Sequence, residues 1–64
     1  MSALIRTPNL PDHDDFYASL LKAHDGLTRE RSQALNARLI LILANHIGDR
    51  DALEEALTLA REAE

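Results

Sequence analysis

Three histidines, His13, His24 and His46, are the residues of this chain best suited to metal binding or proton transfer. A metal-binding helix often carries two histidines four positions apart, or a histidine and a carboxylate three or four apart. No two of these histidines have that spacing, so His24 and His46 could share a metal only through tertiary packing. The simpler interpretation of His46 is a hydrogen bond near a helix end or between two helices.

The acidic residues offer little that is typical of catalysis. The run at residues 12–15 lacks the spaced carboxylates and the glycine of a calcium loop, and favourable charge at a helix start explains it. Acid–base catalysis by carboxylates needs a cleft that shifts their pKa values, and a chain of 64 residues is small for enclosing one. We find no glycine-rich phosphate loop and no serine in a nucleophile context, and we therefore expect no enzyme, no catalytic residue and no cofactor.

The charge balance disfavours nucleic acid as a partner. Seven basic residues face eleven acidic ones, which gives a net charge of −4, whereas binding to phosphates depends on lysine and arginine. A helix-turn-helix interpretation would place the acidic segment after residue 48 in a DNA groove lined by phosphates, which is unfavourable. The longest apolar run, residues 39–44, is far shorter than the roughly 20 residues that span a bilayer. We expect no membrane partner and a cytoplasmic protein.

The composition predicts an all-α fold. Leucine and alanine, 12 and 10 residues respectively, dominate the apolar content, and valine is absent. Two prolines predict an extended N-terminal arm over residues 1–11, followed by a three-helix domain over residues 12–64. We expect Asp12, Thr28 and Asp49 to be the N-caps of the three helices.

Two glycines divide the helical region. Gly26 and Gly48 are natural helix stops, because glycine enters the left-handed region cheaply. The connections around them are short, which predicts that the first and third helices pack against the long central second helix. We therefore expect Leu39 and Leu43, on the main apolar face of the second helix, to be buried.

The second helix is apolar on more than one side. Leu41 points about 200° away from Leu39, since each helical residue turns by about 100°. Helices that are apolar around most of their circumference are buried on several sides. We therefore predict an interface formed by Arg38, Leu41 and Asn45, with a second contact formed by three apolar arm residues: Leu4, Ile5 and Leu10.

Several short motifs resemble those of the domain of unknown function 2783, a family of short bacterial proteins. They are Asn9-Leu10-Pro11-Asp12, Asp15-Phe16-Tyr17, Ala23-His24, Leu35-Asn36-Ala37-Arg38-Leu39 and Ala44-Asn45-His46-Ile47-Gly48-Asp49. The resemblance extends over residues 7–61 and brings no defined catalytic residue. It implies genes near those of flavin-dependent aromatic hydroxylases, and hence an accessory subunit or regulator of such an enzyme.

Size favours association. A domain of about 60 residues buries only about 60% of the surface that its unfolded chain exposes, and small domains add disulfides, metals or oligomerisation. This chain has no cysteine. We predict a non-catalytic helical interaction protein whose partner is itself or a larger enzyme. The alternative is a small metal- or ligand-binding protein that uses its histidines and carboxylates.

Overall fold

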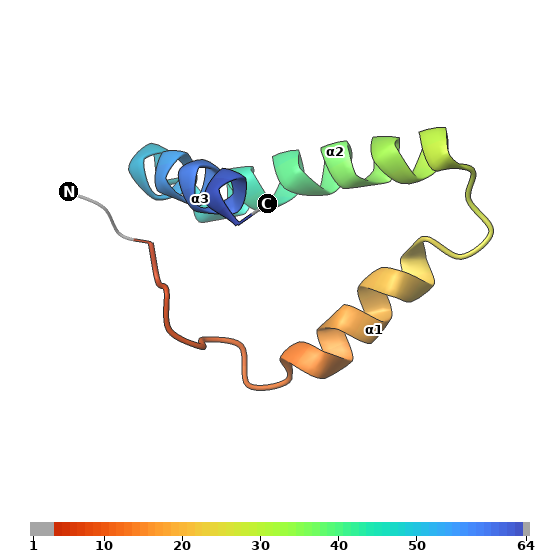
Figure 1. Cartoon of the computed structure of the whole chain (residues 1–64), viewed down its shortest axis with the longest axis horizontal. Helices are drawn as coiled ribbons and strands as arrows, with labels where there is room; N and C mark the ends of the chain where they lie inside the picture. Colours follow the sequence, from red (N-terminus) through yellow and green to blue (C-terminus); the bar gives the residue numbers. More distant parts are fainter. Residues whose placement is uncertain (1–3, 64) are drawn as a thin grey trace.

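The structure, a computed structural model, describes residues 4–63. These residues form three helices and no strand: α1 (His13–Ala23), α2 (Arg29–Ile47) and α3 (Arg50–Glu62) (Figure 1). The all-α expectation is confirmed, and α2 is the longest helix, with 19 residues. The segment before α1 forms no helix and runs from the start of α1 towards α3. Residues 1–3 of the predicted arm, and residue 64, lie outside the described residues.

The predicted boundaries of α2 and α3 are confirmed. The hydroxyl oxygen of Thr28 accepts a hydrogen bond from the backbone N–H of Arg31 at 3.2 Å. The carboxylate of Asp49 accepts one from the N–H of Ala52 at 3.1 Å. Gly48 lies between the two helices with φ +65°, a left-handed conformation that is strained for any residue with a side chain. This turn lets α3 begin directly after α2.

The boundaries of α1 differ from the prediction. Asp12 is at the N-cap position, but its side chain makes no capping hydrogen bond. The helix ends at Ala23, three residues before Gly26, because the next two N–H groups bond to carbonyls three residues back. Gly26 adopts a left-handed φ of +76° within the loop that follows.

The helices diverge instead of stacking. In Figure 1, α1 and α2 form a V whose closed end is the loop at residues 24–28, and α3 crosses the other end of α2 at a steep angle. No two helices pack along much of their length within residues 4–63. The prediction that α1 and α3 cover two sides of α2 is therefore wrong. At 1.5 Å per residue α2 is about 28 Å long and α1 only about 16 Å, so a diverging α1 leaves much of α2 uncovered.

The core is correspondingly small. Ala52, 7% exposed, is the one buried hydrophobic residue of the described chain. Leu39 is half-buried and Leu43 is 46% exposed, so the prediction that both are buried in the core is wrong for the single chain. The reason is the divergence of α1 and α3, which leaves the middle of α2 without a covering helix.

Two global quantities reflect this openness. The radius of gyration is 13.4 Å, whereas a compact chain of this length has a value of about 10.7 Å. The accessible surface is 5919 Å², whereas a folded monomer of this mass exposes about 4,100 Å². The single chain thus exposes about 1,800 Å² more than its mass predicts.

The aspartates at the starts of α1 and α3 provide a test of this local structure. We expect Asp49→Ala to lower the free energy of unfolding by about 1 kcal/mol, because it removes a capping hydrogen bond. The matched variant Asp12→Ala removes the same side chain from a helix start where no such bond exists, and it should cost clearly less. Urea unfolding followed by circular dichroism at one protein concentration measures both. Equal losses would contradict the assignment of the cap.

Candidate interaction surface

The most exposed apolar segment of the molecule is the middle of α2. Residues 40–43 read Ile-Leu-Ile-Leu, and all four are exposed; Leu41 is 70% exposed. Because successive helical residues turn by about 100°, these four side chains point to all sides of α2. None of the helices within residues 4–63 combines the length and apolar character needed to cross a membrane. The segment thus places exposed apolar side chains on all sides of α2.

An apolar groove lies between α1 and α2, and we call it the α1–α2 groove. Its volume is about 340 Å³, and its walls are formed by Phe16, Ser19, Leu20, Ala23, Leu35, Arg38, Leu39 and Ile42. Each helix contributes residues at spacings of three and four, which places them on one helical face. Arg38 is the one charged residue of the lining. A groove of this kind suits the apolar ridge of another helix.

The predicted interface residues of α2 lie along one strip of the helix. Arg38, Leu41 and Asn45 are spaced by three and four residues, and all three are exposed. Arg38 also lines the α1–α2 groove, whereas Leu41 and Asn45 lie outside its lining. The structure therefore gives α2 two adjoining surfaces, the groove and this strip.

Sequence reasoning missed the α1 side of the groove. Phe16, Leu20 and Ala23 have the helical spacing that is typical of a packed face, but nothing in the spacing shows that this face stays open. Phe16 is 49% exposed although it lines the groove. One feature of the sequence could have indicated this exposed face: the helices carry more apolar stripes than so short a chain can cover.

The three apolar residues of the arm do not lie in one place. Leu4 and Ile5 line a second hollow of about 280 Å³ with residues of α3 and the end of α2, among them Leu53 and Ile47. Leu10 lies elsewhere, in a separate hollow of about 310 Å³ that it lines with the two prolines, Asn9 and His13. The first two residues thus approach α3, while Leu10 stays near the start of α1.

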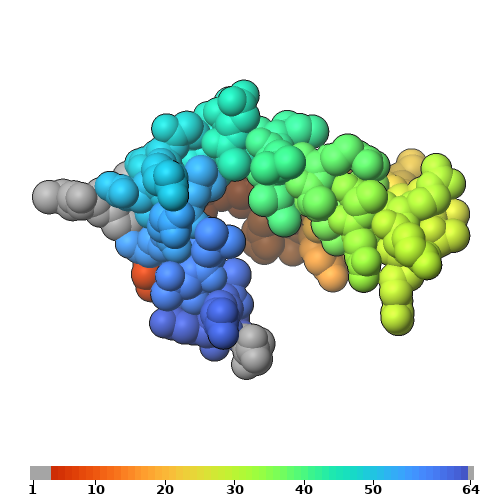
Figure 2. All heavy atoms as spheres, turned by 90° about the horizontal axis from the view of Figure 1, so that it is seen from above, coloured from red at the N-terminus to blue at the C-terminus, as the bar shows by residue number. Residues whose placement is uncertain are grey.

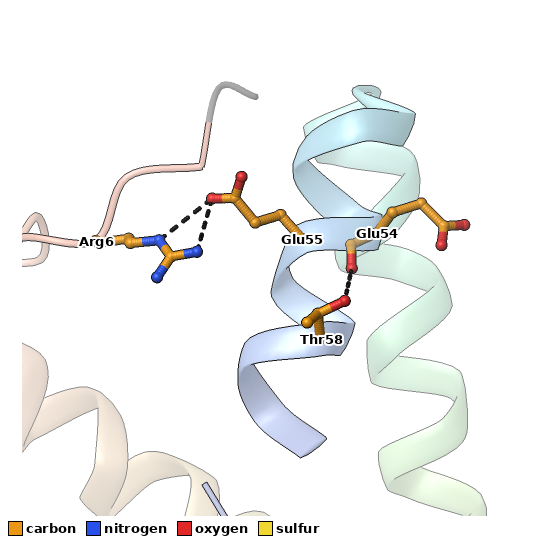
Figure 3. A network of polar contacts seen from close by, with 4 residues as sticks. All are labelled: Arg6, Glu54, Glu55 and Thr58. Carbon is orange, nitrogen blue, oxygen red and sulfur yellow. Dashed lines mark hydrogen bonds and ion pairs between the residues drawn. The ribbon is translucent and has the colours of Figure 1, made fainter. Parts of the chain in front are cut away.

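An ion pair ties the arm to α3. The Nε and Nη2 atoms of Arg6 donate hydrogen bonds to one carboxylate oxygen of Glu55, at 3.2 and 3.1 Å (Figure 3). Glu54 points away from this contact and pairs with Arg50 at 3.2 Å, and its carbonyl accepts a hydrogen bond from Thr58. The contact of Arg6 joins residues 49 positions apart, so no sequence periodicity could reveal it.

The histidines are separated. His24 Nε2 lies 3.1 Å from Asn36 Oδ1 and donates to it in the tautomer that carries its proton there. This contact links the end of α1 to α2. His13 Nε2 lies 3.2 Å from a carboxylate oxygen of Asp14, and His46 is exposed in the last turn of α2. Residues 4–63 contain no group of three histidine, cysteine or acidic side chains that could hold a metal.

The arm contact generates a prediction. We expect Arg6→Ala to lower the 15N–1H heteronuclear NOE of the backbone in residues 4–9, because the arm loses its contact with Glu55. The free energy of unfolding should change by less than about 1 kcal/mol, since exposed ion pairs contribute little. The control Arg50→Ala removes an exposed ion pair within α3 and should leave the NOE values of the arm unchanged. Similar NOE values for the arm in both variants would mean that Arg6 does not hold it.

Comparison with known proteins finds one family. The model of the family described as "Protein of unknown function (DUF2783)" matches residues 4–62, which is nearly the whole chain. Neither the curated proteins nor the solved structures provide a match. The matched region contains all three helices, the α1–α2 groove and the Arg6–Glu55 contact. The chain therefore belongs to the DUF2783 family.

Proposed function

We propose that this chain is a non-catalytic interaction protein that presents apolar helical surface to a protein partner. The partner is a second copy of the chain or a larger enzyme to which the chain is an accessory subunit. The observation that carries the proposal is the exposed apolar segment at residues 40–43 of α2. An apolar helix surface of this extent is typical of a protein interface and unusual on a monomer.

The energetics support a protein as the partner. The surface in excess of a compact monomer is about 1,800 Å², and burial of apolar area contributes roughly 25 cal/mol per Å². A small molecule covers a few hundred Å² at most. Arg38 lines the groove and belongs to the strip. Its presence also favours a protein partner, because arginine is enriched in protein interfaces.

The resemblance of the sequence suggests where such an interaction takes place. The gene neighbourhood that the family implies favours a flavin-dependent enzyme of aromatic catabolism as the larger partner, in the cytoplasm of a bacterium. In that case the chain would contribute surface and not reacting groups. The partner would then complete the core that the single chain lacks.

Photocrosslinking tests this proposal. We expect p-benzoylphenylalanine in place of Leu41 to give one discrete adduct on irradiation of cells, because the side chain at this position lies against the partner. The same amino acid in place of Leu57, a leucine of α3 that is 65% exposed, is the matched control and should give much less of it. The mass of the adduct identifies a second copy or a larger protein. Equal yields at the two positions, or no adduct, would overturn the proposal.

The alternative function, metal or ligand binding by the histidines, has its own measurement. A metal that binds only the native state raises the melting temperature. We expect zinc, nickel and manganese to leave it unchanged, because we expect no metal site. His24 already bonds to Asn36 and has no neighbouring pair of ligands in the described part of the chain. A rise of several degrees that His24→Ala abolishes would favour the metal-binding function.

A further inference from the structure

We propose that a second copy of this chain occupies the α1–α2 groove, so that α1 and α2 of both copies form a four-helix layer around a two-fold axis. The inference rests on the proposed function, because it names a partner for the apolar segment at residues 40–43, of which Ile42 lines the groove. Four-helix arrangements built from two helical hairpins need each hairpin to offer an apolar face to the other. The α1–α2 groove is such a face.

The shape of the groove suits a helix. Its α1 wall carries Phe16, Leu20 and Ala23, and its α2 wall carries Leu35, Leu39 and Ile42. Both sets repeat at spacings of three and four, as ridges that pack into the grooves of a further helix do. Ile42 is 65% exposed although it lines the groove, so a third helix would cover it. The V formed by α1 and α2 opens away from their connecting loop (Figure 1), and the groove of about 340 Å³ lies between these two helices.

The surface that each chain exposes in excess of a compact monomer is large enough for a dimer interface. Each copy exposes about 1,800 Å² more than a compact monomer, and permanent homodimers bury 2,000–5,000 Å² in total, or roughly 1,000–2,500 Å² from each copy. The excess lies within that range. A dimer can thus restore the buried surface that a single chain lacks, without any other component.

The two helices beside the groove differ in charge, which suits an antiparallel contact between copies. The first turn of α1 carries Asp14 and Asp15, whereas α2 carries three arginines, Arg29, Arg31 and Arg38, and a single glutamate, Glu30. Of these charged residues Arg38 lines the groove itself. In a two-fold dimer whose α2 helices run antiparallel, the arginine-bearing half of the second α2 approaches the acidic start of the first α1. The same contact is made twice, as an isologous interface requires.

The remaining acidic charge does not oppose this arrangement. Four of the eight other acidic residues belong to α3: Asp51, Glu54, Glu55 and Glu62. In Figure 2, seen from above, α3 projects from one end of α2 and leaves the rest of α2 clear of it. With Arg50 and Arg61 counted, α3 contributes −2 of the net charge of −4 per copy, and none of its residues lines the groove.

Sedimentation equilibrium of the full chain over a wide concentration range tests the inference. We expect a dimer, and we expect Ile42→Asp to raise its dissociation constant by at least about 30-fold, because an isologous interface contains the substitution twice. Leu57→Asp is the matched control, since both residues are 65% exposed in the single chain and only Ile42 lines the groove. It should change the dissociation constant by less than about five-fold, in keeping with a site outside the interface.

A second measurement locates the contact. In a sample of mixed isotope-labelled and unlabelled chains, we expect intermolecular NOEs between residues of α1 and the methyl groups of Leu39 or Ile42. A dimer that lacks these NOEs and tolerates Ile42→Asp would overturn the inference while leaving an interaction function in place.

A monomer at every concentration would also overturn the inference, and small-angle scattering would then decide the fate of the proposed function. A radius of gyration near the 13.4 Å of the open chain would leave the surface available to a different protein. A value close to the 10.7 Å or so of a compact chain would mean that the helices cover one another, and the proposed function would fail too.

Discussion

The length of α2 relative to its neighbours determines the character of this molecule. A helix of 19 residues cannot be covered by an 11-residue helix that diverges from it and a 13-residue helix that crosses one of its ends. The middle of α2 is therefore exposed, although it is the most apolar stretch of the sequence. The α1–α2 groove, the large radius of gyration and the near absence of buried side chains all follow from this mismatch.

Polar contacts, and not a core, orient the parts of the chain. The contact of His24 with Asn36 fixes the corner between α1 and α2, and the ion pair of Arg6 with Glu55 holds the arm beside α3. Such exposed contacts each contribute little free energy. They restrict the positions of the helices, however, and a surface that is arranged before binding loses less entropy when a partner arrives.

The sequence predicted those features that depend on near neighbours along the chain. The caps at Thr28 and Asp49 and the stop at Gly48 need only residues within one helical turn. The exposed position of Leu41 followed from helical periodicity. The burial of Leu39 and Leu43 was predicted wrongly, because periodicity shows which residues share a face but not whether another helix reaches it. The Arg6–Glu55 contact depends on the path of the whole chain and had no local signal.

The connection between α2 and α3 consists of the left-handed Gly48 and the capping residue Asp49, and the contacts of this chain are mostly local. Chains of this kind fold quickly, because little loop-closure entropy opposes them. In the proposed assembly the slow step would then be the encounter with the partner, whose rate depends on concentration. A copy without a partner presents thinly protected helices to cellular proteases, which degrade open states in proportion to their population. Turnover of unassembled copies would keep the amount of this protein matched to that of its assembly.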